Sequence, residues 1–207
     1  MMHNLKPKNE CLCQTPRYFC LTARILHWSM AVLILAMLFI GIGMVSTVTA
    51  AHRWLLEIHE PLGLLILVLA LVRLAIRILN PPPPLPADLP GWQRFAAHAS
   101  HWLLYALMLA IPLIGWAMLS AEGFPIAIAH SLYLPALMRP NAVAYAVLRT
   151  AHTYLALLLF LTVIVHVGAA LYHGLVRRDG VFSSMSGVGS GRRGSDQDPA
   201  QSHRIAH

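Results

Sequence analysis

Four long runs of apolar residues, separated by short polar or proline-rich segments, dominate the pattern along the chain. They cover about residues 25–48, 62–79, 101–119 and 154–176. A bilayer core of about 30 Å takes roughly 20 apolar residues in helical form, so each run predicts a helix that crosses the membrane. The pattern as a whole predicts an all-α fold, an integral membrane four-helix bundle.

The composition agrees with a membrane protein. Hydrophobic residues make up 57% of the 207 residues and charged residues 11%, a balance unlike that of soluble domains. Residues 1–24 form a polar tail ahead of the first run, which is too apolar over its length for a removable signal peptide and lacks a small-x-small cleavage site. We expect this run to remain as a span.

Basic residues predict the orientation of the helices. They collect in the N-terminal tail, between the second and third runs, and after the fourth run, at Lys6, Lys8, Arg17, Arg24, Arg77, Arg94, Arg177, Arg178, Arg192, Arg193 and Arg204. Because short cytoplasmic loops are enriched in Lys and Arg, both the N and C termini are expected to be cytoplasmic. The net charge of +7 then reflects this bias and contact with membrane lipid, and no nucleic acid partner is expected.

The connections and tails differ in composition. Residues 80–91, NPPPPLPADLPG, predict a stiff extended link, because each proline lacks an N–H donor and restricts the residue before it. The apolar segment 122–149 either lies along the membrane interface or lengthens the fourth helix. Residues 1–20 form a cytoplasmic tail, and residues 180–207, rich in Gly and Ser, predict a disordered one. The cysteines, all in the first tail at Cys11, Cys13 and Cys20, are expected to be free thiols.

Histidines carry the chemical signal of the sequence. Seven lie in or at the ends of the apolar runs, at His27, His59, His98, His101, His152, His166 and His173. One such histidine alone is better explained as a hydrogen-bonded core or interfacial residue than as a ligand. His152 and His166 differ, because 14 residues make nearly four helical turns and place both on one face, about 21 Å apart. This spacing suits two stacked sites.

Each stacked site needs a second histidine at the same depth on another helix. At 1.5 Å per residue, His27 lies about 4.5 Å and His59 about 27 Å from the basic residues that mark the cytoplasmic ends of their helices. The difference, roughly 22 Å, nearly equals the spacing on the fourth helix. We therefore predict that His27 pairs with His166 near the cytoplasm and that His59 pairs with His152 near the outer face.

Paired histidines at two depths of a helical bundle indicate haem. Bundle cores commonly hold haem, and two axial histidines fill the coordination of the iron, which suits one-electron transfer. The sequence has no C-x-x-C-H motif, so covalent c-type attachment is excluded. Glycines near the histidines either make room for a porphyrin or allow close helix packing: Gly41, Gly43, Gly63 and Gly168.

Four segments taken in order resemble the spans of the bacterial cytochrome b561 family. They are RYFCLTARILHWSM, IHEPLGLLILVLALVRLAIRI, HASHWLLYALMLAIPLIGW and AHTYLALLLFLTVIVHVGAAL. The resemblance implies that residues 21–179 form a di-haem cytochrome b domain in the bacterial inner membrane. It implies two haem b groups held by histidines on helices one, two and four, which here are His27, His59, His152 and His166. That family is related to the cytochrome b subunits of nickel-iron hydrogenases and includes a superoxide:ubiquinone oxidoreductase.

Two further residues receive candidate cofactor-binding roles near the cytoplasmic haem. Arg73 either pairs with a haem propionate or extends to the membrane interface. His101 either replaces His27 as a ligand or hydrogen-bonds a propionate or a quinone head group. On the outer side, basic residues could attract an anion such as superoxide: His52, Arg53, Arg139 and Arg149.

The main functional hypothesis is a membrane cytochrome that moves electrons between a quinone, such as ubiquinone, and a one-electron donor such as superoxide. A second version is a cytochrome b anchor subunit that serves a separate dehydrogenase or hydrogenase as its redox partner protein. A different class, a metal transporter using the same histidines, predicts acidic residues beside them inside the spans. The sequence has almost none, since Glu57 and Glu60 lie at an outer end.

Overall fold

Four long helices form the body of the protein. The computed structural model describes residues 19, 21–80, 88–124, 127–129 and 132–187. The helices are α1 (Leu21–Ser46), α2 (Ala50–Leu79), α3 (Gly91–Glu122) and α4 (Ala142–Leu171). Each is long and apolar enough to cross a membrane. The prediction of an all-α four-helix membrane protein is confirmed.

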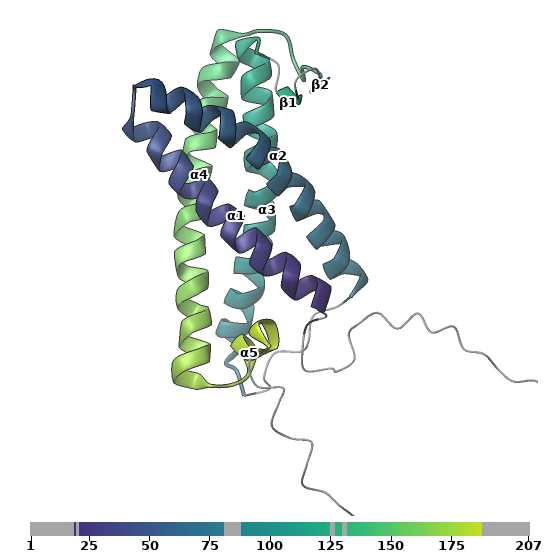
Figure 1. Cartoon of the computed structure of the whole chain (residues 1–207). Coiled ribbons are helices and arrows are strands. Elements are labelled where there is room, and N and C mark those ends of the chain that lie inside the picture. The colour runs from purple at the N-terminus through teal and green to yellow at the C-terminus, as the bar shows by residue number, and fades with distance from the viewer. Residues whose placement is uncertain (1–18, 20, 81–87, 125–126, 130–131, 188–207) are drawn as a thin grey trace, which may run out of the picture.

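The helices run up and down, so their ends gather at two opposite poles (Figure 1). At one pole α1 and α3 begin and α2 and α4 end, and we call it the terminal end. At the other pole α1 turns into α2, and α3 is joined to α4 through two short antiparallel strands, β1 (Ala127–Ala129) and β2 (Leu132–Tyr133). We call this pole the hairpin end.

Local sequence explains where the helices near the hairpin end begin. The side chain of Thr49 accepts a hydrogen bond from the backbone N–H of Ala51 and caps α2. Asn141 accepts two such bonds, each 3.0 Å long, from the first turn of α4. The second helix therefore starts twelve residues earlier than its apolar run, and Pro61 lies inside it, as proline is tolerated in membrane helices.

The segment 122–149 divides between two structures. Its last part lengthens the fourth helix, which begins at Ala142, and this confirms one of the two alternatives for that part. Before it, α3 ends at Gly123, whose φ of 93° is left-handed and stops the helix. The two short strands follow, so the earlier part of the segment is not an extension of α4.

The tail after the fourth span departs from the predicted disorder. α4 continues into η1 (Tyr172–Arg177), a π-helix, and then into a short helix, α5 (Val181–Ser186). Arg24 at the start of α1 explains why this helix forms, because its guanidinium donates to the carbonyls of Met185 and Ser186 at 3.1 and 3.0 Å. Residues 188–207, the proline-rich residues 81–87 and the cysteine-containing tail lie outside the described residues.

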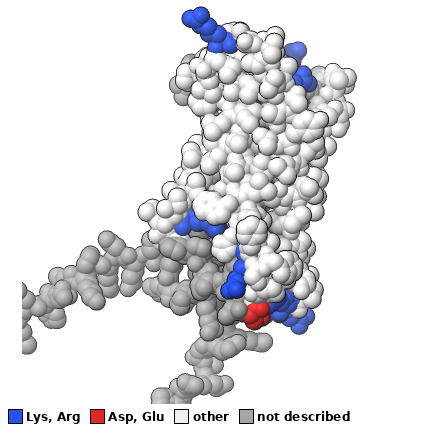
Figure 2. Space-filling view, turned by 180° about the vertical axis from the view of Figure 1, so that it is seen from behind, with Lys and Arg blue, Asp and Glu red and all other residues white. Residues whose placement is uncertain are grey.

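Helix packing follows the order of the chain, with α1 against α2, α2 against α3, and α3 against α4. Gly43 allows the first of these contacts to be close, since a Cβ atom there would lie 3.0 Å from Leu55. A buried core lies toward the terminal end and contains Met30, Ala70, Tyr105 and Met108. Large apolar side chains point outward instead, Phe39 being 70% exposed. Figure 2 shows a broad uncharged band between basic residues at the two ends, as a bilayer requires.

Candidate functional site

The face of α4 that bears two histidines meets α1 and α2 at two different levels. The ring centroids of His27 and His166 lie 6.4 Å apart, with the ring planes at 72°. Those of His59 and His152 lie 6.1 Å apart, with the planes at 61°. Both pairs that the sequence spacing predicts are therefore neighbours in space. We call them the terminal-end pair and the hairpin-end pair.

The separation within each pair fits a metal ion between two imidazoles. A histidine nitrogen binds a metal at about 2 Å and lies about 1 Å from the centre of its ring, so two imidazoles facing each other across one ion have centroids roughly 6 Å apart. Within the described part of the chain, no group of three or more His, Cys, Asp or Glu side chains gathers as a metal site. Each pair thus offers two ligands, which suits an ion that brings its own macrocycle, as haem does.

The hairpin-end pair has unpartnered ligand atoms. The Nδ1 atoms of His59 and His152 are buried and have no hydrogen-bond partner among the described residues. Such atoms cost about 1–3 kcal/mol each when left unsatisfied, and a metal bond removes that cost.

Gly115 on α3 makes room for His152. A Cβ atom at this position would lie 3.3 Å from Cε1 and 3.5 Å from Nδ1 of the imidazole. Nothing in the local sequence marks this glycine, because its role depends on which face of α3 meets α4. Of the glycines suggested by the sequence, a Cβ atom at Gly41 or Gly168 would meet nothing within 4 Å, so neither is required for close packing between the helices.

The terminal-end pair has a third imidazole and a cation beside it. The ring of His101 on α3 lies 5.4 Å from that of His166, which is shorter than the separation that an intervening ion requires. Arg73 on α2 donates from Nε to the hydroxyl of Tyr105 at 3.2 Å. The structure therefore places both candidate cofactor-binding residues, Arg73 and His101, near the predicted pair. Tyr105 was not identified from the sequence, although it lies one helical turn after His101.

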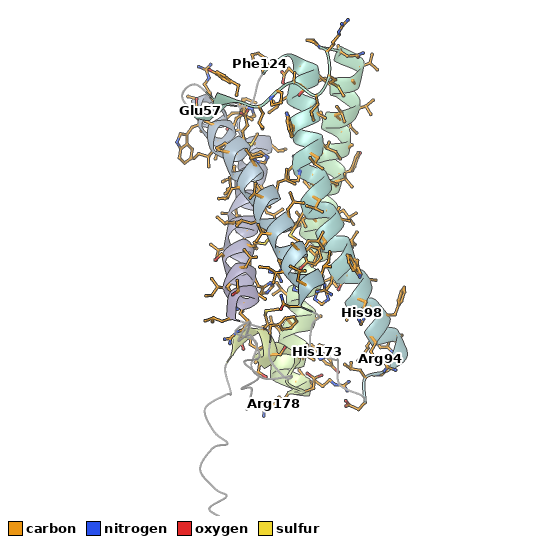
Figure 3. The ribbon with its side chains drawn as sticks, turned by 90° about the vertical axis from the view of Figure 1, so that its right-hand side faces the viewer. Glu57, Arg94, His98, Phe124, His173 and Arg178 are labelled. Carbon is orange, nitrogen blue, oxygen red and sulfur yellow. The ribbon has the colours of Figure 1, made fainter. Side chains whose placement is uncertain are left out.

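The remaining histidines of the described ranges have ordinary partners. His98 is exposed at the start of α3, and its Nδ1 donates to the carbonyl of Arg94 at 2.7 Å. His173 binds the carboxylate of Asp179 at 2.7 Å, and Arg177 also contacts that carboxylate. His52 bonds the backbone carbonyl of Met44 at 3.0 Å. Figure 3 shows His98 and His173 at the terminal end, opposite Glu57 at the hairpin end.

Membrane-crossing helices with histidine pairs stacked inside the bundle are the arrangement of a membrane cytochrome. A family model described as "Prokaryotic cytochrome b561" matches residues 18–187. The chain belongs to this family. It is a multi-pass membrane electron-transfer protein, and the family implies binding of haem b.

Relatives of this chain carry names that agree with the family. Cytochrome b561 homolog 2 of Escherichia coli (strain K12) is 29% identical over 180 residues, which cover 85% of this chain and 95% of the relative. A probable superoxide oxidase, CybB, of Yersinia pestis is 31% identical over 173 residues, with 82% and 95% covered. Cytochrome b561 homolog 1 of Escherichia coli (strain K12) is 30% identical over 129 residues, with 62% and 73% covered.

Proposed function

We propose that residues 21–179 hold two haem b groups, one at each histidine pair, and move electrons between a quinone and a one-electron donor such as superoxide. The observation that carries this proposal is the pairing itself. α4 presents His152 and His166 to two different helices, and both ring separations fit an intervening ion. His27, His59, His152 and His166 are the residues that would hold the two haem irons.

Different residues of the chain have different proposed roles in binding the haems. The four imidazoles hold and orient the two haems, which supply reversible one-electron chemistry when bound. His27 is a better ligand than His101, because its ring stands 6.4 Å from that of His166 whereas the ring of His101 stands 5.4 Å away. Arg73 and His101 are the residues that we propose to bind a haem propionate or a quinone head group.

The proposed electron donor and electron acceptor are supported by the charge of the outer side and by the names of the relatives. The probable superoxide oxidase CybB is similar to this chain along 95% of its length, which supports superoxide as the donor. We place the protein in the bacterial inner membrane with the terminal end in the cytoplasm. Arg53 and His52 then lie on the outer side, where they favour an anion. Two superoxide anions each give up one electron and leave as dioxygen, and one quinone takes both electrons and two protons.

The haem content of the purified protein tests the binding proposal. We expect a b-type difference spectrum on dithionite reduction and about two haems per chain by the pyridine assay. His59→Ala and His166→Ala should each lower this number. His98→Ala is the matched control, because its imidazole is exposed and bonds its own helix. If neither ligand variant loses haem, the proposal is wrong.

The donor requires a separate measurement. The isolated cytochrome, supplied with enzymatically generated superoxide, should become reduced, and it should be reoxidised when a soluble ubiquinone analogue is added. Superoxide dismutase, added first, should prevent the reduction. A protein that contains both haems but is not reduced by superoxide would favour the anchor-subunit version, in which a partner protein donates the electrons.

A further inference from the structure

The two histidine pairs differ in the fixed charge around them. On the terminal-end side, Arg73 projects from α2 and donates to the hydroxyl of Tyr105 at 3.2 Å. Tyr105 is only 5% exposed and packs with Met30 of α1 and Ala70 of α2 in the buried core. This core anchors the guanidinium inside the bundle, because the hydrogen bond holds its Nε against a buried hydroxyl.

The anchored guanidinium lies next to the level of the terminal-end pair. Met30 follows His27 by one helical turn, and Tyr105 follows His101 by one turn, so the core and these imidazoles occupy neighbouring layers. Arg73 interacts electrostatically with His27, His101 and His166. Among the described residues, no carboxylate pairs with Arg73.

The hairpin-end pair has no such anchored cation among the described residues, because Arg53 and Arg149, the basic residues nearest to it along α2 and α4, are exposed. The electrostatic interaction of His59 is with His152, and no Lys or Arg of the described ranges contributes to it. At this end Glu60 interacts electrostatically with the like charges of Glu122 and Glu57. A positive charge anchored inside the bundle therefore accompanies one pair, while the basic residues near the other pair are exposed to solvent.

A fixed positive charge near an iron favours its reduced form, because reduction lowers the charge of the iron by one. A charge held inside the bundle is screened less than one in bulk water, so its effect on the iron is retained. We propose that Arg73, held by Tyr105, is a positioning residue that makes the iron of the terminal-end pair easier to reduce than that of the hairpin-end pair. This inference rests on the proposed two-haem function, and it gives electrons a direction from the hairpin end toward the terminal end.

Redox titration of the purified holoprotein, followed by its haem absorbance, tests this inference. Arg73→Gln should lower the midpoint potential of the terminal-end haem and leave the hairpin-end haem in place. The equilibrium constant for moving an electron to the terminal end should fall about tenfold, which is about 59 mV for a one-electron couple. Arg73→Lys keeps the charge and should retain most of the wild-type potential. A titration in the His59→Ala background isolates the terminal-end signal.

Two further variants serve as controls for the redox titration. Arg77→Gln is the matched control on the same helix, because Arg77 stacks on Trp102 and Tyr105 at 5.9 and 5.6 Å and should change the potential less. Tyr105→Phe releases Arg73 without removing its charge, and should shift the potential in the same direction by less. Equal shifts at both haems, no shift, or a shift as large in Arg77→Gln would overturn the inference. Fewer than two haems in the wild-type protein would instead overturn the proposed function.

Discussion

The terminal-end and hairpin-end pairs use the same helix, α4, but differ in their surroundings. A third imidazole, His101, and a cation, Arg73, accompany the terminal-end pair. The hairpin-end pair has two buried, unpartnered Nδ1 atoms and a glycine pressed against one ring. The two pairs therefore have similar ring separations. They differ in nearby charge and in the presence of a third imidazole. If both pairs bind haem as proposed, the same pair of ligands would act in two different electrostatic surroundings.

The largest difference between the two pairs should appear in the haem content when one proposed ligand is removed from each pair in turn. His59→Ala should abolish binding at the hairpin end, because no third ring contacts that pair within the described residues. His27→Ala should lose less haem, because His101 already lies 5.4 Å from His166 and can move to replace it. The pyridine haem assay should give about one haem per chain for His59→Ala and more for His27→Ala.

A double variant checks the explanation for this asymmetry. His27→Ala combined with His101→Ala should reduce the haem content to that of His59→Ala. If His27→Ala alone already lowers the haem content to that of His59→Ala, then His101 does not substitute as a ligand. Its role would then be limited to binding a haem propionate or a quinone head group.

Gly115→Leu should give the next largest effect, and only at the hairpin end. Even a Cβ atom at Gly115 would lie 3.3 Å from His152, so a leucine must displace the imidazole. The difference spectrum should lose the hairpin-end haem and keep the other. Ala106→Leu, at an exposed position on the same helix, should change neither signal. Retention of both haems in Gly115→Leu would show that His152 adjusts or is not a ligand.

Arg24→Ala should weaken the short helix that is attached to the terminal end alone. The guanidinium satisfies two backbone carbonyls at the end of α5, and their loss should lower the local stability of α5 by about 1–3 kcal/mol. Hydrogen exchange of residues 181–186 should accelerate. Arg178→Ala is the comparison, since its Nε bonds the carbonyl of Leu175 in the preceding turns. Unchanged exchange in Arg24→Ala would mean that Phe182, packed against Gly174, holds the helix by itself.

The smallest effect should come from the cap of α4 at the hairpin end. Asn141→Ala removes two hydrogen bonds to backbone N–H groups and should cost about 1 kcal/mol. Thermal unfolding in detergent should shift downward by a few degrees, without a change in haem content. Asn141→Asp keeps the acceptor and should retain the wild-type midpoint. A loss of haem in Asn141→Ala would show that the start of α4 controls the position of His152.

Much of the fold was predictable because membrane helices are specified by local composition. Each apolar run became a helix, and the lengthening of α2 and α4 beyond those runs depends on the capping residues Thr49 and Asn141. The helix at Val181–Ser186 was missed, because its residues have no apolar period. It forms through bonds to Arg24, more than 150 residues away along the chain.

The sequence by itself determined which histidines could meet. Helical rise and repeat are fixed, so 14 residues on α4 and the depths of His27 and His59 define two levels, and the structure brings the rings together at those levels. Only the tertiary structure decided what surrounds each pair. The positions of Gly115, Tyr105 and Arg73 depend on the rotation of α2 and α3 about their axes, and that rotation is set by side-chain packing between helices rather than by spacing along one of them.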